Sequence, residues 1–258
     1  MTQPIAQAVQ HQFGRQAALY GQSRFHMSGD SLDILVEWGQ PSENHQILDV
    51  ATGAGFTAFA FAQHAARVVA YDLTTEMLQQ ATAIGRQRGL TNVRFVRGAA
   101  ERLPLGDATF DICTCRTATH HFYDIAAFLR EGHRILKPGG LLLIADTASP
   151  ENQDVDGWEN ETEVLRDPSH VRNYSPSEWL RLIGDSGLTA LRADMSLRTE
   201  LGFVDWVQRS GNPPDVVARL RTRFLTAPAS VARAFRIRPD GEDIAFSWPV
   251  FTVLALKE

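Results

Sequence analysis

Two aspartates close short apolar runs in the first third of the chain, and both could bind a polar ligand. Asp49 lies in "QILDVATGAGFTA" and Asp72 closes "RVVAYD". Gly53 and Gly55 permit positive φ angles and let a ligand approach the backbone closely. A carboxylate beside such a turn favours a ligand with a cation, such as an ammonium or a sulfonium, over a pyrophosphate. Asp72 can accept hydrogen bonds from both hydroxyls of a ribose; a helix-capping or loop aspartate is the alternative.

Adjacent histidines in "TATHHFYD" are the candidates for proton transfer. His120 and His121 follow the fourth apolar run, and either could act as a general base or orient a substrate hydroxyl. We expect His121 to lie nearer the ligand; a histidine that caps the next helix is the alternative. His26, His170 and Arg172 occupy polar segments and could face a substrate, although each also suits a solvated loop.

Composition narrows the classes of function. Apolar residues make up 44% of the 258 residues, which allows a sizeable core, and the net charge of -5 gives no support for a nucleic-acid partner.

Cys113 and Cys115 are two apart in "FDICTCR", so both should lie buried on one face of a strand. Two ligands are too few for zinc, and we expect no metal site. The apolar runs are too short to cross a bilayer and no signal peptide is evident, so we expect a soluble, cytoplasmic protein.

Strand-like and helix-like segments alternate between residues 46 and 146, which predicts a parallel sheet with helices on both faces. Before this region, residues 5–20 and 31–39 are expected to be helices. After it, residues 147–175 are polar and are expected to form an inserted loop or lid. The remaining expected elements are a helix at 175–187, a strand at 188–197, helices within 202–235 and a strand at 244–257 with an edge or bulge at Pro249.

Four motifs in register resemble class I S-adenosylmethionine-dependent methyltransferases, most of all the branch of the ubiquinone and menaquinone biosynthesis methyltransferases. They are "ILDVATGAGFTA", "VVAYDLTTEML", "FVRGAAERLPLGDATFDICTCRTATHHF" and "RILKPGGLLLIAD". The resemblance implies an α/β Rossmann-like sheet of seven strands in the order 3-2-1-4-5-7-6, with strand 7 antiparallel and helices on both faces. It implies one domain over residues 1–258, with an N-terminal helical cap at 1–40, a cofactor-binding core at 41–148, and lid segments with C-terminal strands at 149–258.

The resemblance also implies S-adenosylmethionine as the cofactor and assigns roles to single residues. Asp49 would reach the methionine ammonium and Asp72 would hold the ribose hydroxyls. Many members carry Asp where this chain has Ala99, so Glu101 or a backbone N–H is expected to bind the adenine amino group. The other implied cofactor contacts are Tyr20, Ala51, Thr52, Gly53, Gly55, Leu73, Met77, Ala100, Arg116 and His121.

The expected activity is methyl transfer from S-adenosylmethionine to an oxygen, carbon or nitrogen of a small-molecule acceptor, with S-adenosylhomocysteine as the product. His120 and His121 are the candidate catalytic residues. One alternative is a protein that binds the cofactor without transfer activity, as a regulator or partner subunit, which Ala99 keeps open. Another is a nicotinamide oxidoreductase, which the A-x-G-x-G spacing disfavours. The acidic composition argues against a nucleic-acid substrate, and a homodimer is left open.

Overall fold

The computed structural model describes residues 2–20 and 29–258, with side chains at residues 4–17 and 29–258. Its helices are α1 (Thr2–Tyr20), α3 (Asp30–Gly39), α4 (Phe56–Ala62), α5 (Thr75–Gln87), the short 3-10 helix η1 (Thr119–His121), α6 (Ile125–Ile135), α7 (Gln153–Arg166), α8 (Pro176–Asp185), α9 (Phe203–Ser210), α10 (Pro214–Leu225) and α11 (Ala229–Ala234). Its strands are β1 (Gln46–Val50), β2 (Arg67–Asp72), β3 (Val93–Arg97), β4 (Phe110–Arg116), β5 (Leu136–Thr147), β6 (Thr189–Asp194), β7 (Arg198–Gly202), β8 (Arg238–Asp240) and β9 (Asp243–Leu256).

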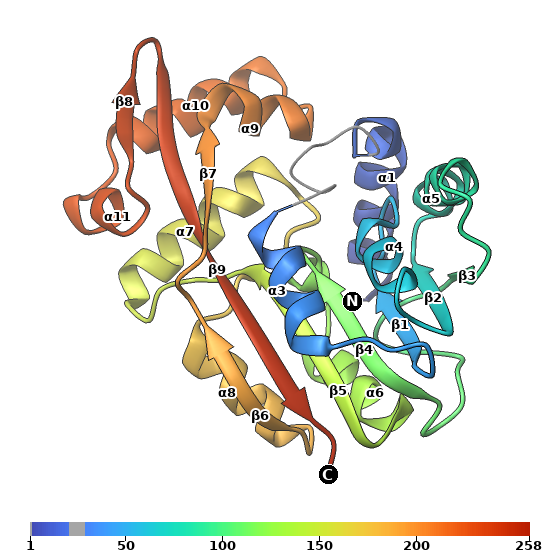
Figure 1. Cartoon of the computed structure of the whole chain (residues 1–258). Helices are drawn as coiled ribbons and strands as arrows, with labels where there is room; N and C mark the ends of the chain where they lie inside the picture. Colours follow the sequence, from blue (N-terminus) through green and yellow to red (C-terminus); the bar gives the residue numbers. More distant parts are fainter. Residues whose placement is uncertain (1, 21–28) are drawn as a thin grey trace.

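One sheet runs through the molecule in the order β3-β2-β1-β4-β5-β9-β6 (Figure 1). Strands β1 to β5 pair in parallel, and β9 pairs antiparallel with both β5 and β6. This confirms the predicted order, with β9 as the seventh strand of the prediction. The sheet also has two strands that were not predicted, β7 and β8. Both pair with the first half of β9.

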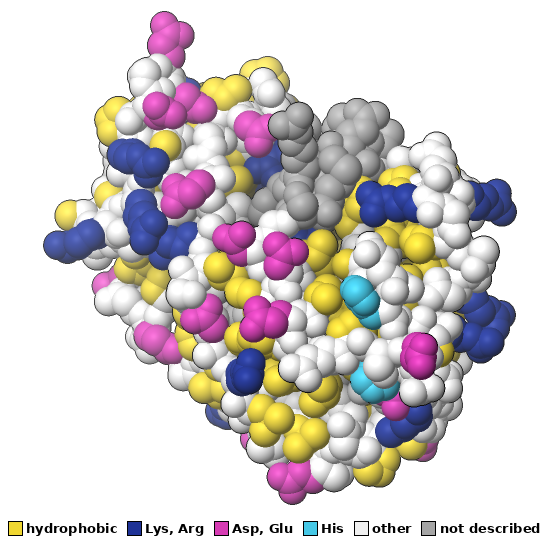
Figure 2. Space-filling model, in the orientation of Figure 1, with side chains coloured by type: hydrophobic (Ala, Val, Ile, Leu, Met, Phe, Trp, Pro, Cys, Tyr) yellow, Lys and Arg dark blue, Asp and Glu magenta, His cyan; other side chains and the backbone are white. Residues whose placement is uncertain are grey.

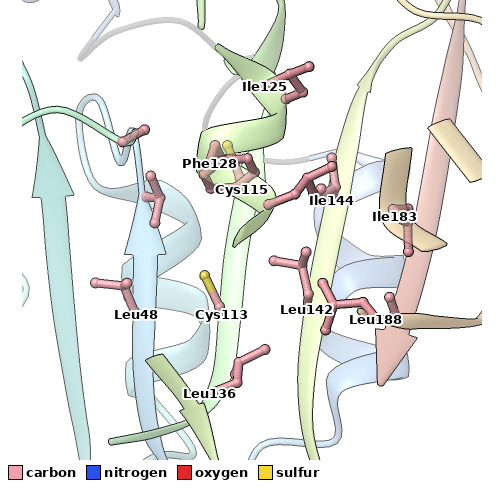
Figure 3. Packing of buried hydrophobic residues seen from close by; sticks show 14 of the residues in the cluster. Leu48, Cys113, Cys115, Ile125, Phe128, Leu136, Leu142, Ile144, Ile183 and Leu188 are labelled. Carbon is pink, nitrogen blue, oxygen red and sulfur yellow. The ribbon is translucent and has the colours of Figure 1, made fainter. Parts of the chain in front are cut away.

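Buried apolar side chains fill both faces of the sheet. On one face, strand residues pack against α6 and α8. Figure 3 shows Cys115 in this layer beside Phe128 of α6, and Cys113 farther along the same strand between Leu48 and Leu142. On the other face, Leu35 of α3 and Phe61 of α4 cover the strands. Both cysteines are free and buried, as predicted. Helices on both faces account for the strands being apolar almost throughout.

A second layer, here called the lid, stands beyond the carboxyl ends of the parallel strands. It consists of α7, α9, α10, α11, β7, β8 and residues 243–249 of β9, and has its own aromatic core that includes Trp158, Trp206, Phe224 and Trp248. β9 joins the lid to the sheet, because β7 pairs with it up to Pro249 and β5 pairs with it from Val250 onward. The long strand in Figure 1 therefore fixes the lid over the sheet edge.

One expectation for the lid needs correction, and the edge expected at Pro249 is found on its β5 side. Residues 153–166 form helix α7 rather than a loop. The acidic sequence hid it, but Asn152 caps its first turn through its side chain, and Val155 and Trp158 bury one face of it. Pro249 lies where β5 has ended, and its carbonyl accepts from Ala148 N at 3.0 Å. Its missing N–H therefore costs no ladder bond to β5.

Candidate functional site

A cleft opens at the carboxyl ends of β1, β2 and β4, where an open parallel sheet binds its ligands. It spans about 1040 Å³ of space, open solvent at its mouth included. Helix α1 covers it with Ile5, Ala6, Val9 and Phe13. The residues that line it and that the sequence assigned to a cofactor are Ala51, Thr52, Gly53, Asp72, Leu73, Met77, Ala99, Ala100, Glu101, Arg116 and His121.

Asp72 ties the first turn to the end of the second strand. Its Oδ2 accepts from Gly53 N at 2.8 Å, and its Oδ1 accepts from Thr74 N at 2.8 Å. Burial raises the pKa of the Asp72 carboxyl, and these backbone N–H groups oppose that shift. Each carboxylate oxygen has a further lone pair for a ligand hydroxyl, since it accepts one backbone bond. The carboxylate thus supports the start of α5 and also lines the cleft.

Gly53 and Gly55 differ in what surrounds them. Gly53 has a φ of 55°, and a Cβ on it would meet nothing within 4 Å, so the turn leaves open space there for a ligand. Gly55 has a φ of 93°, and a Cβ on it would lie 2.4 Å from the Phe59 ring. Gly55 does not line the cleft, so it serves helix packing rather than close approach of a ligand.

Asp49 also lies away from the cleft wall. It is 1% exposed, and its carboxylate accepts from Thr52 Oγ1 at 2.6 Å and from Thr114 Oγ1 at 2.7 Å. Burial raises the pKa of Asp49 to about 6, although both hydroxyls oppose the shift. Any effect of Asp49 on a bound ammonium would therefore pass through Thr52, which lines the cleft.

The expected adenine end of the cleft has no Asp at position 99 but contains a second carboxylate. Glu101 lines the cleft, and its Oε1 accepts from Tyr123 N at 3.1 Å. Burial raises the pKa of this carboxyl. Ala99 contributes backbone, since its carbonyl accepts from the Tyr71 hydroxyl at 3.2 Å. Glu101 therefore places a partly buried carboxylate in the wall of the cleft near Ala99.

The structure leaves two of the expected residues unplaced. α1 ends at Tyr20, but the side chain of Tyr20 lies outside the described residues, as does the whole of His26. Arg172 does not line either pocket; it pairs with Asp156 and Glu178 and so joins α7 to α8.

A second pocket adjoins the first, and Phe13, Thr117 and His121 line both. The lid and the segment that follows α7 (residues 167–173) together supply most of its walls. Its other lining residues are His120, Thr147, Glu163, Arg166, Asp167, His170, Asn173, Thr199, Leu201, Trp206, Arg209 and Trp248. Within the described part of the chain, neither Trp248 Nε1 nor Asn173 Oδ1 has a hydrogen-bond partner, although both atoms are buried. The walls therefore combine aromatic surface with unused polar groups.

Three histidines meet at this pocket. The rings of His120 and His121 lie 4.2 Å apart between centroids, and those of His120 and His170 lie 5.7 Å apart. Burial lowers the pKa of His121 to about 4 and that of His170 to about 2, and the neighbouring His120 adds to both shifts. Burial would also lower the pKa of His120, but the Asp146 carboxylate outweighs it and raises that pKa. His120 is therefore the ring of the three that holds a proton most readily.

Asp146 is the partner that the sequence analysis missed. Its Oδ1 lies 2.8 Å from His120 Nδ1 and accepts from Thr147 N at 2.8 Å, and its Oδ2 accepts from the Thr119 hydroxyl. Burial would raise the pKa of this carboxyl, but His120 and these donors lower it to about 2. The signal lay in "LLLIAD", in which an aspartate follows a buried apolar run, as Asp49 and Asp72 do in the first two strands. Asp124, and not a histidine, caps α6 through its side chain.

Among residues 2–20 and 29–258, no helix is long and apolar enough to cross a membrane. The same part of the chain contains no group of three or more His, Cys, Asp or Glu placed to hold a metal ion.

Comparison with known proteins extends these observations. A family described as a methyltransferase domain matches residues 48–144. An uncharacterized methyltransferase of Bacillus subtilis, YcgJ, is 33% identical over 95% of this chain and 97% of its own length. A demethylmenaquinone methyltransferase of Chlorobaculum tepidum is 40% identical over 42% of this chain and 43% of its own.

Solved structures agree with the sequence relatives. The crystal structure of YcgJ superimposes with a TM-score of 0.82 over 88% of this chain and 98% of that one. A putative methyltransferase of Bacillus halodurans, 34% identical, superimposes with a TM-score of 0.85 over 89% of this chain and 99% of that one. The open space above Gly53 and the carboxylate of Asp72 fit the cofactor of this family, S-adenosylmethionine. The chain is therefore a member of the class I S-adenosylmethionine-dependent methyltransferases.

Proposed function

We propose that this methyltransferase transfers the methyl group to an oxygen, carbon or nitrogen of a small molecule that binds in the second pocket. The observation that carries the proposal is the wall that the two pockets share. A cofactor in the first cleft would present its methyl group near Thr117 and His121, which also line the second pocket. An acceptor there would be aligned with the methyl group.

The walls of the second pocket also suit a small acceptor. Trp206 and Trp248 are almost fully buried and provide apolar surface, while the polar groups between them can orient a ligand. On the face shown in Figure 2, basic and acidic side chains are interspersed. This supports a small molecule rather than the continuous basic surface that a nucleic acid requires.

The roles within the first cleft form part of the same proposal. Asp72 would hold the ribose hydroxyls, Leu73 and Met77 would pack on the adenine, and Glu101 would accept from its amino group. Residues 1–40 would form an N-terminal cap over the core, and residues 149–258 would supply the lid and the last strands. S-adenosylmethionine supplies an activated methyl group when bound, and the protein aligns the acceptor and excludes water.

The test follows a labelled methyl group into a cell extract. The protein is incubated with methyl-labelled S-adenosylmethionine and the extract, which is then separated into small molecules, RNA and protein. Label in the small-molecule fraction is expected, and label confined to RNA or protein would contradict the proposal. Thr199→Phe fills the second pocket and should abolish the labelling without changing S-adenosylhomocysteine binding. Thr189→Phe, on the exposed edge strand β6, is the matched control and should change neither.

A further inference from the structure

We propose that the acceptor belongs to the phenols or enols, and that His120, oriented by Asp146, takes its hydroxyl proton in the second pocket. The inference rests on the proposed function, because it concerns the acceptor of that reaction. His120 lines the second pocket, and its side chain is 16% exposed there, whereas the Asp146 side chain is 1% exposed. His120 would thus touch the acceptor, and Asp146 would act through His120 as a positioning residue.

The position of the ring protons follows from the hydrogen-bond partners. An ionised carboxylate only accepts, so the bond between Asp146 Oδ1 and His120 Nδ1 places a proton on Nδ1. The neutral ring then has its lone pair on Nε2, on the side away from Asp146. Asp146 itself is held by backbone N–H groups of Ala118, His120 and Thr147. The ring is therefore oriented by a fixed carboxylate, as a general base requires.

The other two histidines have no such partner. His121 Nδ1 lies 3.0 Å from the Ser169 carbonyl, which only accepts, so Nδ1 carries a proton. Burial lowers the pKa of this ring to about 4, so it is neutral at neutral pH. His170 Nε2 lies 3.1 Å from Asn160 Oδ1, an atom that also accepts from Asn173 N, so Nε2 carries a proton. Burial lowers the pKa of His170 to about 2, so this ring is neutral as well. His120 is the ring of the three that has a carboxylate to stabilise its imidazolium.

The charges that face His120 come from every element packed around it. Asp146 approaches from β5, Glu163 and Arg166 from α7, and Asp167 and His170 from the segment that follows α7. Arg209 of α9 lines the same pocket and pairs with Asp205 at 3.0 Å. Arg166 pairs with Glu163 at 3.2 Å, so these two charges largely cancel. Asp146 and Asp167 then outweigh the single positive charge of a protonated His120. The site therefore tolerates a proton on this ring during the reaction.

The proposed step balances as follows. The hydroxyl proton of the acceptor moves to His120 Nε2, and the acceptor oxygen forms a bond to the methyl carbon. The bond between that carbon and the cofactor sulfur breaks, and its electron pair goes to the sulfur. His120 later releases the proton to solvent. The step needs no oxidant, reductant or metal ion.

The class of acceptor follows from what an imidazole can deprotonate. A phenol or enol has a pKa within reach of a positioned histidine, whereas an aliphatic alcohol does not. An ammonium group would add a third positive charge beside the sulfonium and His120, while an oxyanion is attracted to both. Trp206 offers an aromatic wall for the ring of such an acceptor.

The test uses 4-nitrophenol, whose phenolate absorbs visibly, with protein saturated by S-adenosylhomocysteine. In the wild type, the apparent pKa of the bound phenol should fall by about one unit, because the His120 cation stabilises the phenolate. His120→Asn keeps a donor for Asp146 but loses the base, and the shift should vanish while S-adenosylhomocysteine binding stays unchanged. Asp146→Asn should reduce the shift. His64→Asn, an exposed histidine after α4, is the matched control and should keep it.

A second measurement needs no variant. Nitrogen NMR of the wild-type imidazoles should show that His120 gains a proton at higher pH than His121 and His170. The proposal is overturned if His121 or His170 gains its proton at a higher pH than His120 does. In the first experiment, it is overturned if 4-nitrophenol binds only as the neutral phenol or does not bind. Benzylamine that binds more tightly than 4-nitrophenol would overturn the class of acceptor. Failure to bind S-adenosylhomocysteine would instead overturn the proposed function, and this inference with it.

Discussion

The backbone N–H of Gly53 donates to Asp72 Oδ2 at 2.8 Å and so joins the first turn of the sheet to the end of its second strand. This contact positions an open glycine backbone beside a carboxylate in one wall of the cleft. The two features match the parts of a nucleoside that need close approach and paired hydroxyl acceptors. Substitutions at this contact should therefore reduce cofactor affinity more than they reduce the stability of the fold.

Substitution of the two turn glycines should separate binding from packing. Gly53→Ala places a methyl group in open space at a φ of 55°, so the free energy of unfolding should fall by about 1 kcal/mol and S-adenosylhomocysteine affinity by roughly tenfold or more. Gly55→Ala should cost about 2–4 kcal/mol, because its Cβ would meet Phe59 at 2.4 Å. Chemical denaturation and calorimetry measure both effects.

The matched control for Gly53→Ala is Gly89→Ala. Gly89 has a φ of 69°, and a Cβ on it would also meet nothing within 4 Å, but it lies after α5 and away from both pockets. It should show the same loss of stability with unchanged affinity. An equal loss of affinity in both variants would contradict the role given to Gly53.

Ala51 adopts the left-handed backbone conformation that favours glycine, with a φ of 54°. An L-residue in this region is strained by about 1–2 kcal/mol, part of which the greater freedom of glycine in the unfolded chain offsets. Ala51→Gly should therefore raise the free energy of unfolding by about 0.5–1 kcal/mol. Ala54→Gly, where φ is not left-handed, should lower it. Equal effects of the two substitutions in urea denaturation would refute the strain at Ala51.

Asp49 should give the protein a defined pH dependence. Its pKa is about 6 in the folded state against 3.8 in the unfolded chain, so the folded state binds the proton more tightly. Stability contributed by this proton is present below pH 4 and is lost as the pH rises from about 4 to about 6, by about 3 kcal/mol. Asp49→Asn should flatten this decline in denaturation curves recorded at about pH 4 and about pH 6.5. A decline of the same size in the variant would show that Asp49 is not its source.

In the proposed binding mode, the end of the cleft that holds the adenine has Ala99 where the resemblance leads us to expect an aspartate. Ala99→Asp should supply a further acceptor for the adenine amino group and tighten S-adenosylhomocysteine binding by about 5–10-fold. Asp at this site lies near Glu101, whose pKa should rise further because the two carboxylates repel. Weaker binding of S-adenosylhomocysteine by calorimetry would mean that Glu101 already fills this role.

Strand periodicity predicted where the strands lie, and the resemblance carried by the motifs after β1, β2 and β4 predicted the sheet order and the cofactor residues. Most of the expected cofactor residues converge because the carboxyl ends of parallel strands share one edge. The Gly53 and Gly55 roles could not be told apart from the sequence, since the difference lies in the position of the Phe59 ring. The burial of Asp49 likewise depends on Thr52 and Thr114, and Thr114 belongs to another strand.

The second pocket depended on the lid and was less predictable. Helix α7 was missed because its acidic sequence suggested a loop. The side chain of Asn152 nevertheless caps its first turn and stabilises the helix. The contact between His120 and Asp146 joins two strand ends that are far apart in the sequence. Trp248 and Thr199 reach the pocket because β9 continues beyond the sheet and pairs with β7, a pairing that no local pattern indicates.

Calorimetry of S-adenosylhomocysteine binding to the wild type and to Asp72→Ala tests the central claim most directly. We expect binding in the micromolar range for the wild type and a loss of about tenfold to a hundredfold or more in the variant, because two charged hydrogen-bond acceptors disappear. NAD should bind neither protein. Equal affinity of the two proteins for S-adenosylhomocysteine, or no binding by the wild type, would contradict the assignment of the cleft.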